Sequence, residues 1–441
     1  MTRLSRSVSA ALAVVLIAAT AACSSPAELE AVEIPSTPVG EQTSWVVESL
    51  SSERAIETVD VDGRFTEEMI AEVPLDQLAL VLDRFRETRP WVPTSYDGDD
   101  TQAVVRLEST KSTPLQMTIA VDDAGTIAGL FFGAPSPEHT PASSFDELTS
   151  ALGAVDYDAQ LYVSEAGETV YEFGNGSPGP IASAFKLYVL GAVVDAVAAG
   201  ELAWDDELVI DDAVKSLPSG ELQDRPSGST VDVIEAASKM IAISDNTATD
   251  LLIRAVGRDA VEAQLEIMGH SDPSLDTPFA TTREFFWIGW GNEALKERWA
   301  DGDEAERRAV LADVPAGVPP IDGIAEDVVW TDDVDWFATA TDLVRAHEAL
   351  QQKASTAAGQ PVRGILSANP GIDFGDEWTY VGFKGGSSTG VMSGAWYLER
   401  EGGEPVVAVM LASSDDPTAV VDPAVVFAHV QDAVALTLAG D

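Results

Sequence analysis

Cysteine and histidine are almost absent from this chain of 441 residues. Its single cysteine, Cys23, excludes an internal disulfide and the paired-cysteine sites that hold structural zinc. The four histidines lie outside every motif described below, so a serine activated by a histidine is not expected. They are His139, His270, His347 and His429. No glycine-rich phosphate loop is present either, and we therefore expect neither a metal nor a cofactor.

Positive charge is also scarce. The chain has 25 Lys and Arg against 74 Asp and Glu, a net charge of −49. Such a surface repels phosphate backbones and anionic headgroups, so nucleic acid is not an expected partner. The charge is typical of a solubilising or salt-adapted surface, with a cationic partner as the alternative. Of the few lysines, Lys186 and Lys384 recur in the motifs below.

The N-terminus predicts export. Arg3 and Arg6 precede an uncharged apolar run at 8–22, which is typical of a signal peptide (1–22) and too short for a membrane span. The run ends in T-A-A-C, which resembles a lipobox, where Cys23 would receive a diacylglyceryl group. We expect a protein anchored by this lipid to the outer face of the cell membrane. A plain signal peptide with a chance cysteine is the alternative.

Composition predicts a tether and two domains after the leader. Residues 23–42 are rich in Pro, Ser, Thr and Glu without apolar periodicity, which predicts a disordered tether. Residues 43–135 predict a small α+β domain in which nothing catalytic clusters, so we expect it to be structural or to shape a substrate site. Its predicted helix and three strands lie at 75–85, 103–107, 115–121 and 127–132.

The second predicted domain, 143–441, begins and ends with strands. A hairpin about Ala166-Gly167 comes first, helices follow, and three strands and a helix close the chain. The first strands must pair with the last to close one sheet, which predicts an α+β domain with an antiparallel sheet flanked by helices. The strands are predicted at 160–163, 169–173, 380–384, 391–399 and 405–412, and the helices at 145–152, 183–199, 231–244, 247–256, 259–268, 340–350 and 423–438.

The first chemical motif is an S-x-x-K, Ser183 to Lys186, at the start of an apolar helix. One helical turn separates the two side chains, so they share a face, and the amides of a helix N-terminus can stabilise an oxyanion. Burial of Lys186 among Phe185, Leu187 and Tyr188 would lower its pKa and leave a neutral amine able to take the serine proton. The motif alone is weak, because such matches arise often by chance.

The second motif is the tripeptide Ser244-Asp245-Asn246, which closes one predicted helix and opens another. A chance match is improbable because the chain has only four asparagines. The Ser244 hydroxyl can relay a proton to a leaving group, and Asn246 can hold Lys186 and a substrate amide. The Asp245 carboxylate is expected to cap the following helix.

The third motif, Lys384-Gly385-Gly386, follows an apolar strand. The glycines allow a ligand to approach the strand closely, and Lys384 can attract a substrate carboxylate. The amide of Ser387 can join the amide of Ser183 as an oxyanion donor. Judged alone, the motif fits a bulge with an exposed lysine equally well.

The order and chemistry of the three motifs resemble those of the class A β-lactamase and penicillin-binding protein superfamily, over residues 143–441. The resemblance implies a serine hydrolase that forms an acyl-enzyme on Ser183, with Lys186 as general base and Ser244 as proton relay. The substrate would be a small molecule: a β-lactam, an ester or amide with a carboxylate, or a cell-wall peptide. The substrate-binding residues that the resemblance implies are Asn246, Lys384, Gly386 and Ser387.

A leader and a smaller front domain resemble, more closely, one lipoprotein branch of that superfamily. It is related to the β-lactamase-like cephalosporin esterase of clavulanic acid gene clusters. The resemblance implies an NTF2-like front domain, similar to steroid isomerases, and a pocket lined by Phe383 and Met392.

Two positions depart from the superfamily pattern. Gly385 stands where a hydroxyl residue is usual, so we expect carboxylate recognition either to pass to Ser387 or Ser388 or to weaken. The stretch 271–336 is rich in aromatic residues and has no E-x-x-L-N, the motif that positions the deacylating water in class A β-lactamases. Glu284 is the nearest candidate, but its context predicts the first turn of a helix. We therefore expect slow deacylation.

Two other functions remain open on the sequence. A peptidoglycan D-Ala carboxypeptidase or transpeptidase would use the same three motifs, and release of D-alanine would identify it. A non-catalytic binding lipoprotein would keep the fold without turnover, and stoichiometric labelling would identify it.

Overall fold

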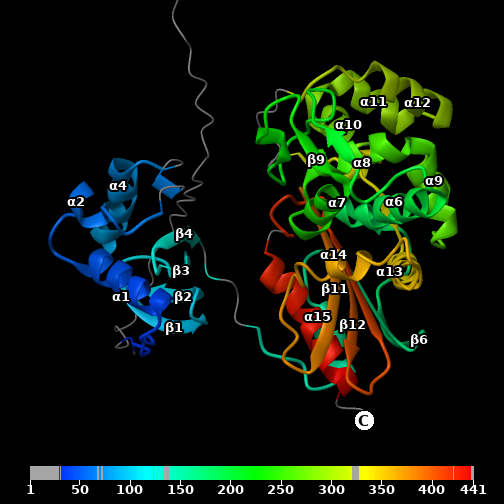
Figure 1. Ribbon diagram of the computed structural model, residues 1–441. Helices are drawn as coiled ribbons and strands as arrows, with labels where there is room; N and C mark the ends of the chain where they lie inside the picture. Colours follow the sequence, from blue (N-terminus) through cyan, green and yellow to red (C-terminus); the bar gives the residue numbers. More distant parts are fainter. Residues whose placement is uncertain are drawn as a thin grey trace, which may run out of the picture. The chain divides into compact units, whose positions relative to one another are not determined.

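The computed structural model describes residues 29, 31–66, 69–70, 73–122, 124–133, 135, 139–319, 327–420 and 422–438. They form two compact units, Met1–Pro137 and Glu138–Asp441 (Figure 1). The described part of the first unit has one hydrophobic core, and the second unit has two cores. The predicted leader and Cys23 lie outside the described residues.

The first unit is a four-stranded antiparallel sheet with helices packed on it. Its strands follow one another in the order β1-β2-β3-β4. Leu50, Leu82, Val105 and Ile119 are among its buried core residues. The helix and the three strands predicted from the sequence are all present. The elements are α1 (Pro38–Ser51), α2 (Thr58–Val61), α4 (Leu75–Phe85), β1 (Val92–Gly98), β2 (Gln102–Glu108), β3 (Leu115–Val121) and β4 (Ile127–Gly133).

Helices α1 and α2 and strand β1 of this unit were not predicted. Helix α1 begins at Pro38, inside the range predicted as a tether, so that prediction is wrong from Pro38 onward. The Thr37 hydroxyl accepts a hydrogen bond from the Gly40 N–H at 3.1 Å, and the proline occupies the first turn, two signals that start a helix. Strand β1 contains Pro93 and lies at the sheet edge, where a proline is tolerated.

The second unit is built on a five-stranded antiparallel sheet with the order β11-β12-β13-β5-β6. Strand β13 pairs with β5 from Val406 opposite Glu165 to Ser413 opposite Asp158. The prediction that the first strands pair with the last is therefore confirmed. Strand β11 is left at one edge. The strands are β5 (Asp158–Glu165), β6 (Glu168–Phe173), β11 (Trp378–Ser388), β12 (Val391–Arg400) and β13 (Val406–Ser413).

Helices cover both faces of this sheet because side chains alternate along each strand. Trp396 and Leu398 of β12 join one core with α5 and α15, whereas Ala395 and Tyr397 join the other with α6 and α13. The residues Ala182–Ala199 are long and apolar enough to cross a membrane, but 67% of this stretch is buried, as in a core helix. The helices are α5 (Phe145–Leu152), α6 (Lys186–Ala199), α7 (Val233–Ala242), α8 (Asn246–Val256), α9 (Arg258–Ile267), α10 (Thr282–Phe286), α11 (Glu293–Asp301), α12 (Glu304–Asp313), α13 (Ala340–Ala354), α14 (Val362–Leu366) and α15 (Pro423–Leu438).

Short elements connect the helices and set the path of the chain near the site. The two-residue strands β7 and β10 pair with each other, and β7 directly precedes the turn η2, which contains Ser183. A π-helical turn, η5, follows α10 directly. Their bounds are β7 (Gly179–Pro180), η2 (Ala182–Phe185), β8 (Glu207–Val209), η3 (Leu222–Asp224), β9 (Thr230–Asp232), η4 (Pro273–Asp276), η5 (Trp287–Gly291), η6 (Trp330–Asp332) and β10 (Phe337–Ala338).

Candidate active site

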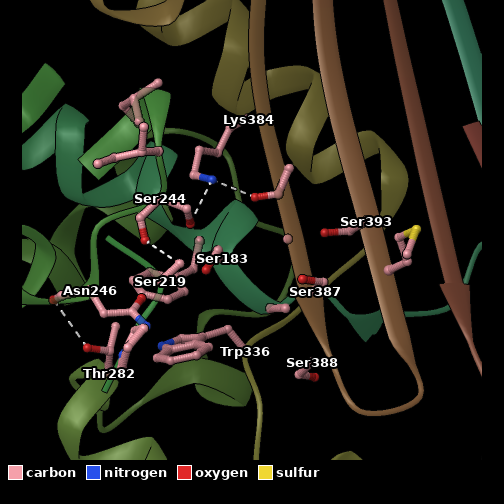
Figure 2. Close-up of a pocket in the computed structure, with 18 of the residues that line it drawn as sticks. Ser183, Ser219, Ser244, Asn246, Thr282, Trp336, Lys384, Ser387, Ser388 and Ser393 are labelled. Carbon is pink, nitrogen blue, oxygen red and sulfur yellow. Dashed lines mark hydrogen bonds between the residues drawn. The ribbon is translucent and has the colours of Figure 1, made fainter. Parts of the chain in front are cut away.

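A cavity of about 580 Å³ lies where α7, α8 and α10 meet the edge strand β11 (Figure 2). Lys186 lies behind its wall and reaches it through Ser244 and Asn246. The structure thus brings the predicted site residues of the second unit together, while their roles stay predictions. Those that line the cavity are Ser183, Ser244, Asn246, Phe383, Lys384, Gly386, Ser387 and Met392.

Ser183 lies in a short 3₁₀ turn, η2, and not in the α-helix predicted to begin there. Helix α6 starts only at Lys186. Of the described residues 181–194, Ser183 alone is not buried, and it lines the cavity together with Ala182 and Phe185. The preceding Ala182 has φ +42°, a left-handed conformation that is rare for residues with a side chain and common at functional sites.

Lys186 is fully buried, as predicted. Its amine donates to the Ser244 carbonyl oxygen at 2.6 Å and to Asn246 Oδ1 at 2.7 Å, and lies 3.0 Å from Ser244 Oγ. Burial, reinforced by the charge of Lys384, lowers the pKa of the amine well below its ordinary value. A neutral amine has two N–H donors and one lone pair. The two oxygens that only accept can take both donors, which leaves the lone pair for a hydroxyl proton.

The second motif joins the two lysines. Ser244 Oγ lies 3.0 Å from the amine of Lys186 and 3.1 Å from the amine of Lys384 (Figure 2 shows the second contact). Asp245 is the N-cap of α8: one carboxylate oxygen accepts from the Ala248 N–H at 2.7 Å, and the other accepts from two N–H groups of the η3 turn. The cap predicted for Asp245 is confirmed. Ser244 itself has φ +56°.

Lys384 is buried, and the interpretation of the third motif as a bulge with an exposed lysine is wrong. Only 2% of the residue is exposed, and its amine donates to Ser244 Oγ and, at 2.6 Å, to the Gly385 carbonyl oxygen. Burial lowers the pKa of this amine to about 7. The predicted strand end at 384 is also wrong, because Gly385 and Gly386 remain paired with β12 and the strand runs to Ser388.

Gly386 allows β11 to lie directly against the backbone at Ile181–Ser183. A Cβ at this position would lie 2.3 Å from the Ile181 carbonyl oxygen and 2.6 Å from the Ser183 nitrogen, closer than any side chain tolerates. Only glycine permits this approach. The neighbouring Ser387 is exposed and lines the cavity. The backbone of Ser387 therefore lies one residue beyond the contact with the Ser183 amide.

Two residues that sequence reasoning did not single out fix this turn. Ser393 of β12 is fully buried and donates to the Ile181 carbonyl oxygen at 2.6 Å. Asp335 accepts from the Ala182 N–H at 2.7 Å and from the Ser388 hydroxyl at 3.2 Å. Neither residue stands in a motif, so the sequence offered no sign of them. Of the two serines expected to take over carboxylate recognition, Ser388 therefore already donates its hydroxyl proton.

Aromatic side chains form another wall of the cavity. Phe285 and Phe286 of α10, Trp290 of η5, and Trp336 all line it. The Trp336 ring stacks on Phe185 with 3.8 Å between centroids. Turns of π-helix such as η5 are rare and occur often at functional sites. This wall occupies the part of the chain where the class A motif for the deacylating water was expected and not found.

Glu284 has a structural role, as predicted. Its carboxylate accepts from the Thr281 N–H at 2.7 Å in a capping box and pairs with Arg258 at 2.8 Å. It does not line the cavity, and neither does any other carboxylate or imidazole of the described residues. Asp322 and Glu326 lie outside the described residues.

Three potential metal ligands meet elsewhere in the second unit. The ligand atoms of His139, His429 and Asp432 all lie within 4.8 Å of one another. His139 Nε2 lies 2.9 Å from Asp432 Oδ2, which also accepts from the Ala142 N–H at 3.0 Å. These contacts tie the start of the unit to α15. No sequence pattern indicates these contacts, because 293 positions separate His139 from Asp432.

The fold and the site together define the class of protein. An antiparallel sheet with helices on both faces carries a serine at the start of its core helix. Two buried lysines share the hydroxyl of a second serine beside it. This is the arrangement of the β-lactamase and transpeptidase fold.

The comparison with protein families gives the family. The family model described as "Beta-lactamase enzyme family" matches residues 147–424. The match spans more than half of the chain, and the protein belongs to this family. A second family model, described as "ORF 12 gene product N-terminal", matches residues 34–127. No curated protein matches the chain.

Solved structures with the same fold are distant in sequence. A class A β-lactamase from Bacteroides cellulosilyticus DSM 14838 is 20% identical with a TM-score of 0.50, over 69% of this chain and 100% of that one. PBP-A is 18% identical with a TM-score of 0.49, over 70% and 100%. A β-lactamase from Sphaerobacter thermophilus DSM 20745 is 22% identical with a TM-score of 0.46, over 66% and 94%. At this level of identity the likeness concerns the fold alone, and the predicted fold class is confirmed.

Proposed function

We propose that this protein is an exported serine hydrolase that forms an acyl-enzyme on Ser183. One observation carries the proposal: a single hydroxyl, Ser244 Oγ, lies within hydrogen-bond distance of both buried amines, and Ser244 and Ser183 line the same cavity. That arrangement provides a base for the nucleophile and a proton path to the leaving group.

The proposed chemistry uses these contacts and adds one, between Ser183 Oγ and the amine of Lys186. The lone pair of Lys186 takes the Ser183 proton as Oγ attacks the carbonyl carbon of the substrate. The amides of Ser183 and Ser387 bind the oxyanion, and losing one such donor would cost about 3 kcal/mol. The proton then passes through Ser244 to the leaving nitrogen or oxygen as its bond to carbon breaks. Lys384, whose amine contacts the same hydroxyl, balances the charge of a substrate carboxylate.

The proposed substrate is a β-lactam, or an ester or amide that carries a carboxylate. The lining of aromatic side chains favours an apolar acyl group. With no carboxylate among the described residues of the cavity, the water that releases the acyl group is activated by Lys186, and release is slower than acylation. An ester suits such a site because its alcohol leaves without strong acid assistance.

The front unit supports a more specific proposal. The match of residues 34–127 to an N-terminal domain described for an ORF 12 gene product favours the branch related to cephalosporin esterases. In that branch the front domain is NTF2-like and the protein is a lipoprotein. We accordingly propose export through the leader at 1–22 and a lipid anchor on Cys23.

Intact-mass analysis tests the proposal directly. The full-length chain and its Ser183→Ala variant are exposed to a nitrocefin-type chromogenic cephalosporin and to a p-nitrophenyl ester, and sampled over time. We expect an adduct on the wild type that decays slowly and no adduct on the variant. An absence of adduct on wild-type Ser183 with every substrate would refute the proposal.

Two further outcomes separate the alternatives. An adduct that never decays, with one equivalent of product released, identifies a binding protein without turnover. Release of D-alanine from a muramyl pentapeptide, without hydrolysis of the cephalosporin, identifies a carboxypeptidase.

A further inference from the structure

The turn that carries the nucleophile is held from outside by one carboxylate. Ala182, immediately before Ser183, has φ +42°, which an alanine does not adopt without support. Its N–H donates to Asp335 Oδ1 at 2.7 Å, and the next N–H back, that of Ile181, donates to the Trp336 carbonyl oxygen at 2.8 Å. The segment at 335–336 therefore fixes the backbone immediately before Ser183.

The same carboxylate reaches the third motif. The Ser388 hydroxyl of β11 donates to Asp335 Oδ2 at 3.2 Å, and the Trp336 N–H donates to Oδ1 at 2.8 Å. Among the described residues no lysine, arginine or histidine pairs with Asp335. The side chain thus bridges two segments through hydrogen bonds alone. Ala182 precedes the first proposed oxyanion donor, and Ser388 follows the second, Ser387.

We propose that Asp335 is a positioning residue that sets the separation of the Ser183 and Ser387 amides, the two proposed oxyanion donors. This inference rests on the proposed function, because those amides act only if Ser183 is acylated. Asp335 touches neither substrate nor the reacting atoms. It acts through two hydrogen bonds, one from the Ala182 N–H before the first proposed oxyanion donor and one from the Ser388 hydroxyl after the second. Oxyanion stabilisation depends on such prearranged geometry.

The geometry of the contacts provides an isosteric test variant. Both N–H donors reach Oδ1, and only the Ser388 hydroxyl reaches Oδ2. In Asp335→Asn the amide oxygen accepts both N–H groups, and the amide nitrogen donates to Ser388 Oγ. This variant keeps all three contacts and makes the side chain neutral at every pH, whereas burial raises the pKa of the Asp335 carboxyl to about 7. Asp335→Ala removes all three hydrogen bonds, and Ser388→Ala removes only the hydrogen bond between Asp335 and β11.

The experiment measures acylation of the full-length chain by the chromogenic cephalosporin in a stopped-flow instrument. The saturation constant is separated from the limiting acylation rate, and adduct on Ser183 is verified by mass. We expect Asp335→Ala to lower the limiting rate about 100-fold, with the saturation constant within twofold of the wild type. Asp335→Asn should stay within about threefold of the wild-type rate, and Ser388→Ala should lose about tenfold. The double variant Asp335→Ala/Ser388→Ala should be no slower than Asp335→Ala, because both remove the same bridge.

A purely structural role would give a different pattern. It would lower the melting temperature and the fraction of active protein, while the acylation rate per active molecule would stay at the wild-type value in Asp335→Ala. That result, or rates of the two single variants that multiply in the double variant, would overturn the inference. If Asp335→Ala does not fold, Ser388→Ala and Asp335→Asn decide the question by the same criteria. A wild-type chain without a Ser183 adduct would overturn the proposed function and this inference with it.

Discussion

The side of the cavity around Ser183 and the aromatic wall are built on different principles. Around the nucleophile, hydrogen bonds fix each group: Lys186 has three partners, and Ser244 contacts both amines. The wall formed by α10, η5 and Trp336 presents rings that pack on one another, such as Phe285 on Trp290 at 5.3 Å between centroids. Polar side chains are therefore concentrated on the side of Ser183, and apolar aromatic rings form the other wall.

This difference teaches which half-reaction the site is built to perform. In the proposed mechanism, attack by Ser183 needs a base, a proton relay and amide donors. The proposed base and relay, Lys186 and Ser244, lie 3.0 Å apart, and the Ser183 amide lies against Gly386 of β11. Attack by water needs a base aimed at the open side of the acyl group, and the described part of the wall offers no carboxylate or imidazole for it. The proposed enzyme would therefore acylate readily and deacylate slowly, with the amine of Lys186 as the base of both steps.

The largest expected effect comes from Lys186→Met. Methionine fills the same buried volume without a titratable group, so we expect the acylation rate to fall about 1,000-fold. Because the proposal makes Lys186 the base of both steps, deacylation of an adduct formed with excess ester should slow by a similar factor. Stopped-flow acylation and the decay of the adduct mass check the two rates.

A control separates loss of the base from loss of charge. Lys296→Met removes a lysine that pairs with Glu293 on α11, away from the cavity, and should leave both rates unchanged. A slow acylation with unchanged deacylation in Lys186→Met would contradict the shared role. The water-activating group would then be sought among residues such as Asp322 and Glu326.

The next effect is expected from Gly386→Ala. The added methyl group would lie 2.3 Å from the Ile181 carbonyl oxygen, a backbone atom that cannot move aside, so β11 must shift from the nucleophile turn. We expect the acylation rate to fall about 100-fold, the size of losing one oxyanion donor. The matched control is Gly364→Ala in α14, where no atom lies within 4 Å of the new methyl group. Acylation by Gly386→Ala at the control's rate would show that the close approach is unimportant.

Local patterns predicted most of the fold. Helices α5 and α15 match their predicted bounds because a capping serine or a proline marks their start and an apolar periodicity fills them. The strand order followed from one argument, that the first hairpin must close a sheet with the last strands. The elements that were missed include helix α1, which Thr37 starts inside a polar stretch, and strand β1, which contains Pro93. Helices α2, α11, α12 and α14 were not predicted either.

The sequence predicted the site residues that belong to the three motifs and missed those that lie outside them. Ser183, Ser244 and Lys384 could be predicted because each belongs to a short motif of neighbouring residues. Asp335 does not, because it lies 153 positions from Ala182, and only the pairing of β7 with β10 brings them together. The burial of Lys384 could not be predicted either. Two glycines beside a lysine indicate an exposed lysine, and the sequence does not show that other segments cover this strand edge.

The smallest effect is a pH dependence of substrate binding. Burial lowers the pKa of Lys384 to about 7, so its amine is protonated below pH 7 and neutral above it. A substrate carboxylate should therefore bind more weakly as pH rises from 6 to 9, by about tenfold, the value of a charge-assisted hydrogen bond. Calorimetric binding to Ser183→Ala measures this without acylation, and so without the titration of Lys186 in the rate. The dissociation constant of a matched ligand that lacks the carboxylate should stay flat, as should that of the carboxylate ligand in a Ser183→Ala/Lys384→Met variant. A flat profile for the carboxylate ligand in Ser183→Ala would mean that the charge of Lys384 does not recognise it, and would assign recognition to Ser387 alone.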